Sequence, residues 1–125
     1  MSDLPPPFDS FRLEVEPGHH KDFGLAKDDP YPLRGVTYPV AYGDILGFTG
    51  EDGADLDVFI GSGELLGYIK VWRDDTPDGE HKFYVNVTES EEADILSQFG
   101  PVITEQGRFA SFEGLLAALE PFRNQ

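Results

Sequence analysis

The strongest constraint on the fold of this chain lies in residues 38–61, where two β-favouring runs are joined by a glycine-containing acidic turn. The turn carries four carboxylates within seven residues, namely Glu51, Asp52, Asp55 and Asp57. Gly50 and Gly53 permit the backbone angles of a tight loop, and residues 58–60 are typical of a buried strand that leaves it. Because crowded carboxylates repel one another and oxygen ligands suit hard divalent cations, the turn predicts a Mg²⁺ or Ca²⁺ site. A solvated acidic turn between two strands is the alternative that the spacing leaves open.

The chain is strongly acidic, with 24 Asp and Glu residues against 9 Lys and Arg residues and a formal net charge of -15. Such a surface repels phosphate backbones and anionic lipids, so we expect neither nucleic acid nor a membrane as a partner. A small anionic substrate stays compatible with this charge, provided that metal ions screen it. The sequence has no cysteine, and residues 1–7 have neither the basic region nor the apolar run of a signal peptide. We therefore expect a cytoplasmic protein. Whether it forms a homo-oligomer is left open by the sequence.

Glycine and proline are frequent, with 14 and 10 residues, which favours short elements and many turns over a helical bundle. Residues 22–35 show little periodicity and are expected to be irregular. Apolar alternation and aromatic runs predict strands at residues 11–16, 36–42, 57–60, 67–73 and 81–87. The last two of these are expected to form an antiparallel hairpin, because residues 74–79 have the composition of a turn.

Two helices are predicted in the C-terminal third of the chain. Thr88 and Glu91 have the spacing of a capping box before a helix over 91–98, and Ser111 is a suitable cap for a helix over 114–122. Residues 102–112 can supply one or two further short strands. We therefore expect a single domain over residues 1–125 that is mainly β (α+β), with a small five-stranded OB-like β-barrel and two peripheral α-helices.

A family resemblance sharpens the reading of the acidic turn. Residues 38–43 (Tyr-Pro-Val-Ala-Tyr-Gly) followed by residues 52–58 (Asp-Gly-Ala-Asp-Leu-Asp-Val) resemble the core of the soluble (family I) inorganic pyrophosphatases. In that family a Tyr-Pro-x-x-Tyr-Gly segment precedes an Asp-Gly-Asp-Pro-x-Asp-Val metal loop. The likeness runs from the first strand through the hairpin and fades after about Asn86. It implies a five-stranded barrel flanked by helices and a Mg²⁺-dependent hydrolysis of pyrophosphate.

The resemblance also implies roles for individual residues. Expected metal ligands are Asp52, Asp57, Asp74, Glu80 and Glu14. Expected contacts to the phosphate groups are Lys21, Arg34, Tyr42 and Lys82. Asp57 and Asp55 are the expected catalytic carboxylates. In such a site the metal ions withdraw charge from the phosphorus and activate a water, while the cationic side chains hold the leaving phosphate.

The chain departs from the family at a position that matters for the reaction. Where the family has the middle Asp of the loop, a general base, this chain has Ala54, and Asp55 stands where the family has Pro. The late Tyr-Lys pair of the family is missing between residues 97 and 108, where Arg108 is the only basic residue. Loss of a positioned base typically lowers the rate by on the order of 10² to 10⁴.

Three functions are compatible with these observations. The first is a reduced, Mg²⁺-dependent hydrolase of pyrophosphate or a related phosphoanhydride. The second is a non-catalytic barrel of the pyrophosphatase fold that binds metal, phosphate or a protein partner, which Ala54 favours. The third is an acidic interaction protein that mimics nucleic acid, for which the carboxylates should be spread over the surface. Convergence of Asp52, Asp57, Asp74 and Glu80 in one pocket would argue against the third.

Overall fold

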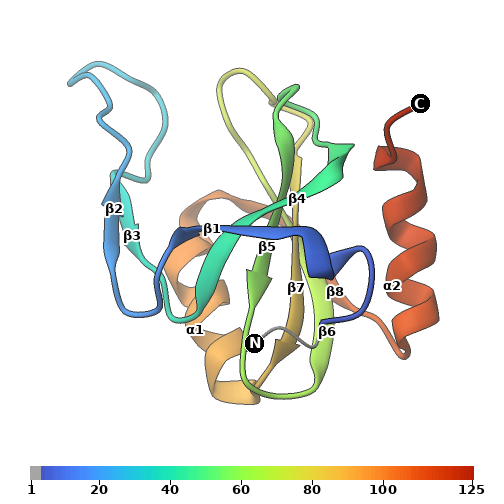
Figure 1. The fold of residues 1–125 in the computed structure, drawn as a ribbon. Coiled ribbons are helices and arrows are strands. Elements are labelled where there is room, and N and C mark those ends of the chain that lie inside the picture. The colour runs from blue at the N-terminus through green and yellow to red at the C-terminus, as the bar shows by residue number, and fades with distance from the viewer. Residues whose placement is uncertain (1–3) are drawn as a thin grey trace.

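The computed structural model describes residues 4–125 and consists of a mixed six-stranded sheet, a small two-stranded sheet and two helices (Figure 1). The strands are β1 (Phe11–Val15), β2 (His20–Asp22), β3 (Gly35–Thr37), β4 (Ala41–Thr49), β5 (Asp55–Ile60), β6 (Leu65–Val71), β7 (Glu80–Val87) and β8 (Ile103–Arg108). The helices are α1 (Glu89–Phe99) and α2 (Phe112–Leu119), and three short 3-10 turns occupy Phe8–Ser10, Gly100–Val102 and Glu120–Phe122. The predicted α+β class is therefore confirmed.

The large sheet has the order β1-β4-β5-β7-β6-β8. All neighbouring strands are antiparallel except β5 and β7, which run parallel. The predicted hairpin is confirmed, because β6 and β7 pair antiparallel across residues 72–79. Within residues 4–125, β1 and β8 are edge strands that do not pair with each other, so the sheet is open. A closed five-stranded barrel is not confirmed.

Both helices begin at the caps expected from the sequence. The Thr88 hydroxyl accepts the Glu91 N–H at 3.0 Å, and the Glu91 carboxylate accepts the Thr88 N–H at 2.9 Å. This capping box starts α1 at Glu89, two residues earlier than predicted. The Ser111 hydroxyl accepts the Gly114 N–H at 3.1 Å and starts α2. The predicted last turn of α2 is a 3-10 turn instead, because Pro121 removes a backbone donor there.

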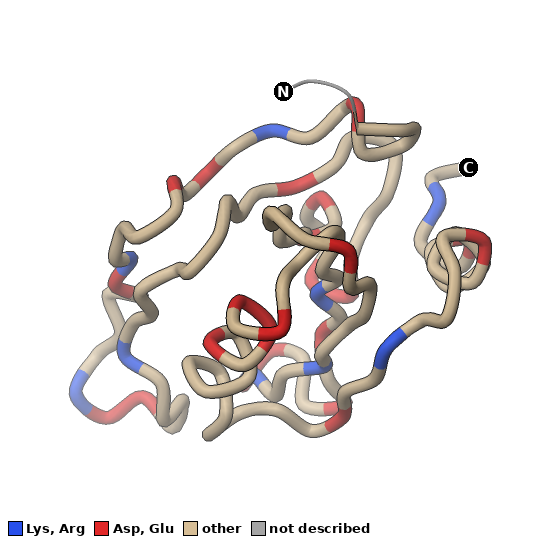
Figure 2. The backbone as a smooth tube through the Cα atoms, turned by 90° about the horizontal axis from the view of Figure 1, so that it is seen from below, with Lys and Arg blue, Asp and Glu red and all other residues tan. Residues whose placement is uncertain are grey.

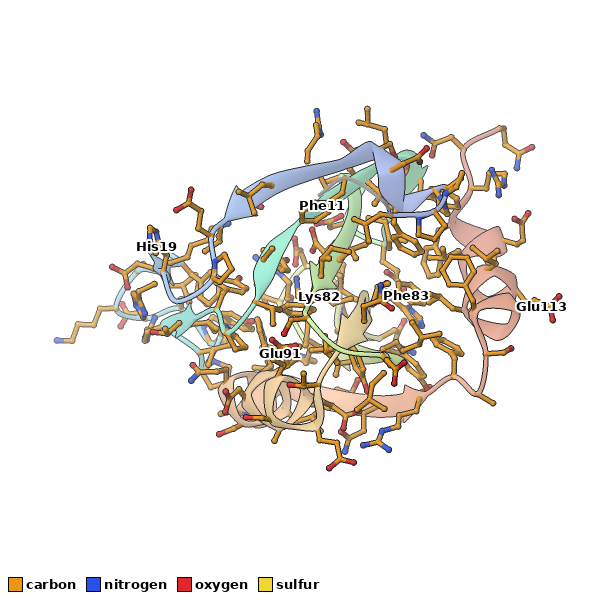
Figure 3. The ribbon with its side chains drawn as sticks, turned by 60° about the horizontal axis from the view of Figure 1, so that its bottom comes forward. Phe11, His19, Lys82, Phe83, Glu91 and Glu113 are labelled. Carbon is orange, nitrogen blue, oxygen red and sulfur yellow. The ribbon has the colours of Figure 1, made fainter. Side chains whose placement is uncertain are left out.

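The sheet is covered on both faces, so its central strands are apolar on both sides. One buried cluster, which includes Tyr38, Phe59 and Phe99, lies under α1. The other, which includes Phe83 and Leu115, lies under α2. Figure 3 shows the consecutive residues Lys82 and Phe83 on opposite sides of β7, with Phe83 on the α2 side. The period of two along β7 therefore directs Lys82 away from α2.

The β2–β3 pair forms an arm at the side of the main sheet (Figure 1). The pair was not predicted, because β2 has only three residues and because the single strand expected over residues 36–42 is divided into the end of β3 and the start of β4, with Pro39 between them. Residues 23–34 form the loop that the arm closes, and Tyr31 returns from this loop to stack on Trp72 with 6.3 Å between ring centroids. Among the residues described, no helix has the length and apolar character needed to cross a membrane.

Candidate functional site

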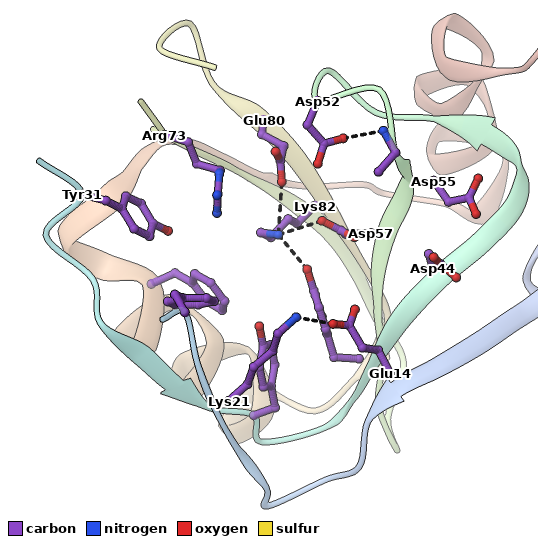
Figure 4. A pocket seen from close by; sticks show the side chains of 15 residues that line it. Glu14, Lys21, Tyr31, Asp44, Asp52, Asp55, Asp57, Arg73, Glu80 and Lys82 are labelled. Carbon is purple, nitrogen blue, oxygen red and sulfur yellow. Dashed lines mark hydrogen bonds and ion pairs between the residues drawn. The ribbon is translucent and has the colours of Figure 1, made fainter. Parts of the chain in front are cut away.

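The parallel pairing of β5 and β7 brings Asp57 and Lys82 to the same level of the sheet. The Lys82 ammonium donates to Asp57 Oδ2 at 2.8 Å, to the Tyr42 hydroxyl at 2.7 Å and to Glu80 Oε2 at 3.4 Å (Figure 4). Only 7% of the Lys82 surface is exposed. A buried ammonium has three donors, and these three oxygens use all of them.

The acidic turn between β4 and β5 places Asp52 close to this group of side chains around Lys82. Gly53 has φ +84°, a conformation that favours glycine, and its N–H donates to the Gly50 carbonyl at 3.0 Å. Asp52 Oδ1 accepts the Ala54 N–H at 2.9 Å, which fixes the side chain over the turn. In Figure 4 the Asp52 carboxylate lies beside Glu80, which comes from the start of β7. Two segments far apart in the chain thus place carboxylates next to each other.

These side chains line a cavity of about 270 Å³. Three cationic side chains lie among its walls, namely Lys21, Arg73 and Lys82. Six carboxylates lie there as well, namely Glu14, Asp44, Asp52, Asp55, Asp57 and Glu80. The rest of the wall is largely aromatic and includes Tyr31, Tyr38 and Tyr42. An excess of carboxylates in a half-enclosed space attracts cations.

Glu80 is the most perturbed carboxyl of the cavity. Only 3% of its surface is exposed, and Oε1 has no hydrogen-bond partner among the residues described. Burial raises the pKa of Glu80 to about 7, with Lys82 acting in the opposite direction and the charges of Asp52 and Asp57 adding to the rise. Glu80 therefore holds a proton for part of the time at neutral pH, and a cation beside Oε1 would favour the ionised form.

The pKa values of Lys82 and Tyr42 are both raised further above their already high usual values. Burial works against the charge of Lys82, yet Tyr42, Asp57 and Glu80 hold its pKa well above the usual value. Burial raises the pKa of Tyr42 well above its usual value, although Lys82 partly offsets this. At neutral pH the site therefore contains a fixed ammonium and a neutral phenol hydroxyl.

The donor set of the cavity fits a hard divalent cation, because it consists of carboxylate oxygens and includes the unpartnered Oε1 of Glu80. Across residues 4–125, no three carboxylate or imidazole side chains are already gathered closely enough to form a complete metal cage. Mg²⁺ commonly uses one or two protein carboxylates and completes its shell with water and phosphate oxygens. Asp52, Asp57 and Glu80 are the residues that could hold it.

Most of the residues expected from the sequence come together in this cavity. Its walls include Glu14, Lys21, Tyr42, Asp52, Asp55, Asp57, Glu80 and Lys82. Two expected residues are not brought there. Arg34 donates to the Ala26 carbonyl at 3.1 Å within the arm loop. Asp74 is exposed at a neighbouring cavity, which shares Tyr31 and Arg73 with the first one.

Asp55 reaches the rim of the cavity but is already paired. Its Oδ2 accepts Arg12 Nη2 at 2.5 Å, and Arg12 also donates to both oxygens of Asp44 at 3.1 Å. Ala54, at the position where the related family carries its base, lies in the cavity wall. The described residues near this wall therefore provide no free carboxylate at that position. Arg108 is also engaged, since it donates to Glu92 at 2.6 Å and 2.9 Å.

Sequence reasoning missed several residues of the site. Asp44 lies opposite Asp57 in the β4–β5 register, a pairing that the strand alternation around residues 41–45 and 56–60 could have indicated. Tyr31 and Arg73 also line the cavity. Tyr31 belongs to the loop of the unpredicted arm, and Arg73 follows the end of β6, where strand periodicity no longer fixes the direction of a side chain. The strand predicted over residues 67–73 included Arg73 but did not direct its side chain to the cavity, and no local pattern indicated Tyr31.

Comparison of this chain with protein-family models, with curated proteins and with solved structures finds no match. The likeness to the soluble pyrophosphatases therefore rests on sequence motifs alone, chiefly those at residues 38–43 and 52–58.

Proposed function

We propose that the protein binds a small phosphate-containing anion together with Mg²⁺ in this cavity and hydrolyses pyrophosphate or a related phosphoanhydride. One observation carries the proposal: Asp52 and Asp57, from the β4–β5 turn and the following β5, line one cavity with Glu80 from the start of β7, and this cavity also holds a buried ammonium. This convergence argues against an acidic surface that mimics nucleic acid. A mimic needs carboxylates spread over an exposed face, whereas two of these three flank Lys82 in the interior.

The residues of the cavity have different roles in the proposed reaction. Asp52, Asp57 and Glu80 would hold Mg²⁺, which when bound supplies positive charge at the phosphate oxygens and lowers the pKa of a coordinated water. Lys82 keeps Asp57 and Glu80 in place through its hydrogen bonds. The Tyr42 hydroxyl keeps its own proton for donation, because Lys82 donates to its oxygen rather than accepting from it. The aromatic wall limits the access of bulk water.

A second candidate is binding without turnover, and specific contacts favour it. Ala54 cannot act as a base, and Asp55 is bound by Arg12 at the rim of the cavity. Hydrolysis in this site would therefore lack a free carboxylate at the position where the related family has its base. We expect turnover to be slower by on the order of 10² to 10⁴ than in a site with a positioned base.

The test is phosphate release from pyrophosphate in the presence and absence of MgCl₂. Mg²⁺-stimulated release that is abolished in Asp57→Asn and retained in Asp94→Asn would support hydrolysis, because Asp94 is exposed on α1 and outside the cavity. Thermal unfolding of both variants separates lost activity from lost folding. Absence of phosphate release from the wild-type protein at ample Mg²⁺ would refute the proposed hydrolase activity.

Calorimetric titration with Mg²⁺ and imidodiphosphate, a non-hydrolysable analogue, distinguishes the second candidate. Binding without phosphate release would establish the non-catalytic function, and a failure to bind would refute both candidates. The cytoplasmic location expected from the sequence stays part of this proposal. The five-stranded OB-like barrel expected from the sequence also stays a proposal.

A further inference from the structure

Arg73 lies at the mouth of the cavity on a tightly constrained turn. The preceding residue, Trp72, donates its N–H to the Val102 carbonyl at 2.8 Å, and Thr76 donates its N–H to the Arg73 carbonyl at 3.1 Å. The backbone of Arg73 is therefore fixed from both sides. Its side chain is 35% exposed and in Figure 4 extends into the cavity between Tyr31 and Glu80.

The three cations of the cavity differ in how many donors they have left. Lys82 has none, because Tyr42, Asp57 and Glu80 accept all three of its protons. Lys21 donates one of its three protons to Glu14 and, unlike Arg73, has no planar fork of donors. Arg73 donates from Nε to the exposed carboxylate of Asp75 at 3.3 Å. Across residues 4–125 no carboxylate or backbone carbonyl accepts a hydrogen bond from an Nη group of Arg73, and the Tyr31 hydroxyl is the side chain that interacts with the guanidinium beside Asp75, so N–H donors remain for a ligand.

The orientation of this guanidinium is held by an aromatic ring. The Arg73 carbon Cζ lies 5.2 Å from the centroid of the Tyr31 ring, a distance at which cation–π attraction operates. Tyr31 is itself buried and stacks on Trp72. A guanidinium fixed in this way loses little freedom when a ligand binds, which favours affinity.

We propose that Arg73 is the residue that binds the anionic ligand of the cavity and that Lys82 is a positioning residue for the carboxylates. This inference rests on the proposed function, because it names the anion-binding group of the same site. Two adjacent N–H groups on a planar fork match two oxygens of one phosphoryl group. The ligand class is therefore an anion with a terminal phosphoryl group that reaches the Tyr31 side of the cavity.

The test is calorimetric titration of imidodiphosphate in the presence of MgCl₂ with a set of arginine variants. Arg73→Gln should weaken binding by about 10- to 100-fold, as expected for the loss of hydrogen bonds to a charged group. Arg73→Lys should recover part of this loss, because it restores the charge without the fork. Arg123→Gln is the matched control, since Arg123 also lies over an aromatic ring, that of Phe48, and pairs with a carboxylate, Glu120, outside the cavity. It should bind as the wild type does.

The outcomes separate this inference from the proposed function. If the wild type binds and Arg73→Gln binds equally well, the assignment of Arg73 is overturned while the proposed function stands. Weaker binding in Arg34→Gln than in Arg73→Gln would also overturn it and would restore the expectation from the sequence. If the wild type binds no imidodiphosphate, both fail. Arg73-dependent binding without phosphate release supports the inference and refutes hydrolysis. Thermal unfolding of Arg73→Gln close to that of the wild type excludes a structural effect.

Discussion

Lys82 is the residue on which the geometry of the cavity depends. A buried ammonium loses its hydration, and this cost is offset only where oxygens accept all of its protons. Tyr42, Asp57 and Glu80 do so here. The reverse also holds, since Asp57 and Glu80 are close together and would repel each other without the ammonium between them.

Removal of this ammonium should therefore be strongly destabilising. We expect Lys82→Gln to lower the free energy of unfolding by about 3 to 5 kcal/mol, because it leaves two carboxylates without their counter-charge. Urea denaturation measures this difference. Lys27→Gln, a substitution of an exposed lysine in the arm loop, should change the free energy by less than about 0.5 kcal/mol. Equal stabilities of the two variants would contradict the role of Lys82.

Glu80 should make the stability of the metal-free protein depend on pH. The pKa of Glu80 is raised to about 7 in the folded state from 4.5, so the folded state binds this proton more tightly than the unfolded chain. The resulting stability is complete below about pH 4.5 and is lost as the pH rises through about 7. We expect the stability of Glu80→Gln relative to wild type to increase by roughly 3 kcal/mol between pH 4.5 and pH 8.

Urea denaturation at several pH values in the presence of EDTA measures this effect. The exposed Glu113→Gln controls for the loss of one negative charge from an acidic protein. Parallel pH profiles for the wild type and Glu80→Gln would show that Glu80 ionises normally. The unpartnered Oε1 would then need another explanation.

Among the elements, the β2–β3 arm determines how the aromatic side of the cavity closes. Its loop, residues 23–34, returns to the body of the protein through Tyr31, which contacts both Trp72 and Arg73. Within the loop, Asp29 accepts the Tyr31 N–H at 2.8 Å. Because β2 and β3 have three residues each, they form only a short ladder of backbone hydrogen bonds. The position of the loop therefore depends mainly on side-chain packing.

Truncation of Tyr31 should release the loop without unfolding the sheet. We expect Tyr31→Ala to increase the rate of native-state trypsin cleavage after Lys27 by about tenfold, because the aromatic contacts that hold the loop are lost. Tyr31→Phe keeps the ring and should be cleaved at nearly the wild-type rate. Mass spectrometry of early fragments identifies the cleaved bond. Equal cleavage rates for the two variants would show that the ring does not anchor the loop.

The start of α1 offers a test of the cap that the sequence predicted. Thr88→Ala removes the acceptor for the Glu91 N–H and should lower the free energy of unfolding by about 1 kcal/mol. Thr88→Ser keeps a hydroxyl and should lose much less. Urea denaturation followed by circular dichroism measures both variants. A similar loss in Thr88→Ser would mean that the methyl group, not the hydrogen bond, stabilises this helix end.

On the scale of the whole molecule, the dominant property is negative charge. Figure 2 shows acidic positions throughout the fold, including helix α1. With a net charge of -15, the folded chain repels itself, and this lowers its stability at low ionic strength. General screening by salt and specific binding of a divalent cation in the cavity are therefore separate sources of stabilisation.

A comparison at equal ionic strength separates the two sources. We expect MgCl₂ at about 10 mM to raise the melting temperature by about 3 °C or more beyond NaCl of the same ionic strength, because a bound cation stabilises only the folded state. EDTA should reverse the rise, and Asp57→Asn should abolish the excess over NaCl. Identical melting temperatures in the two salts would argue against a specific site.

Local signals in the sequence predicted much of the fold. The hairpin of β6 and β7, the capping box at Thr88 and the cap at Ser111 are each specified by residues a few positions apart. Eight of the residues expected at the site line the cavity. Arg34 and Asp74 do not, because each lies in a loop where neighbouring backbone or solvent determines the side-chain direction.

The sequence by itself determined the chemistry available to this protein. It contains an acidic turn between two strands, a predicted strand that carries Lys82, and two aromatic runs. Only the tertiary structure decided how these groups meet. The parallel pairing of β5 with β7 sets Lys82 between Asp57 and Glu80, and the arm loop carries Tyr31 to Arg73. Strand order and loop packing depend on contacts between residues far apart in the chain, and no local pattern records them.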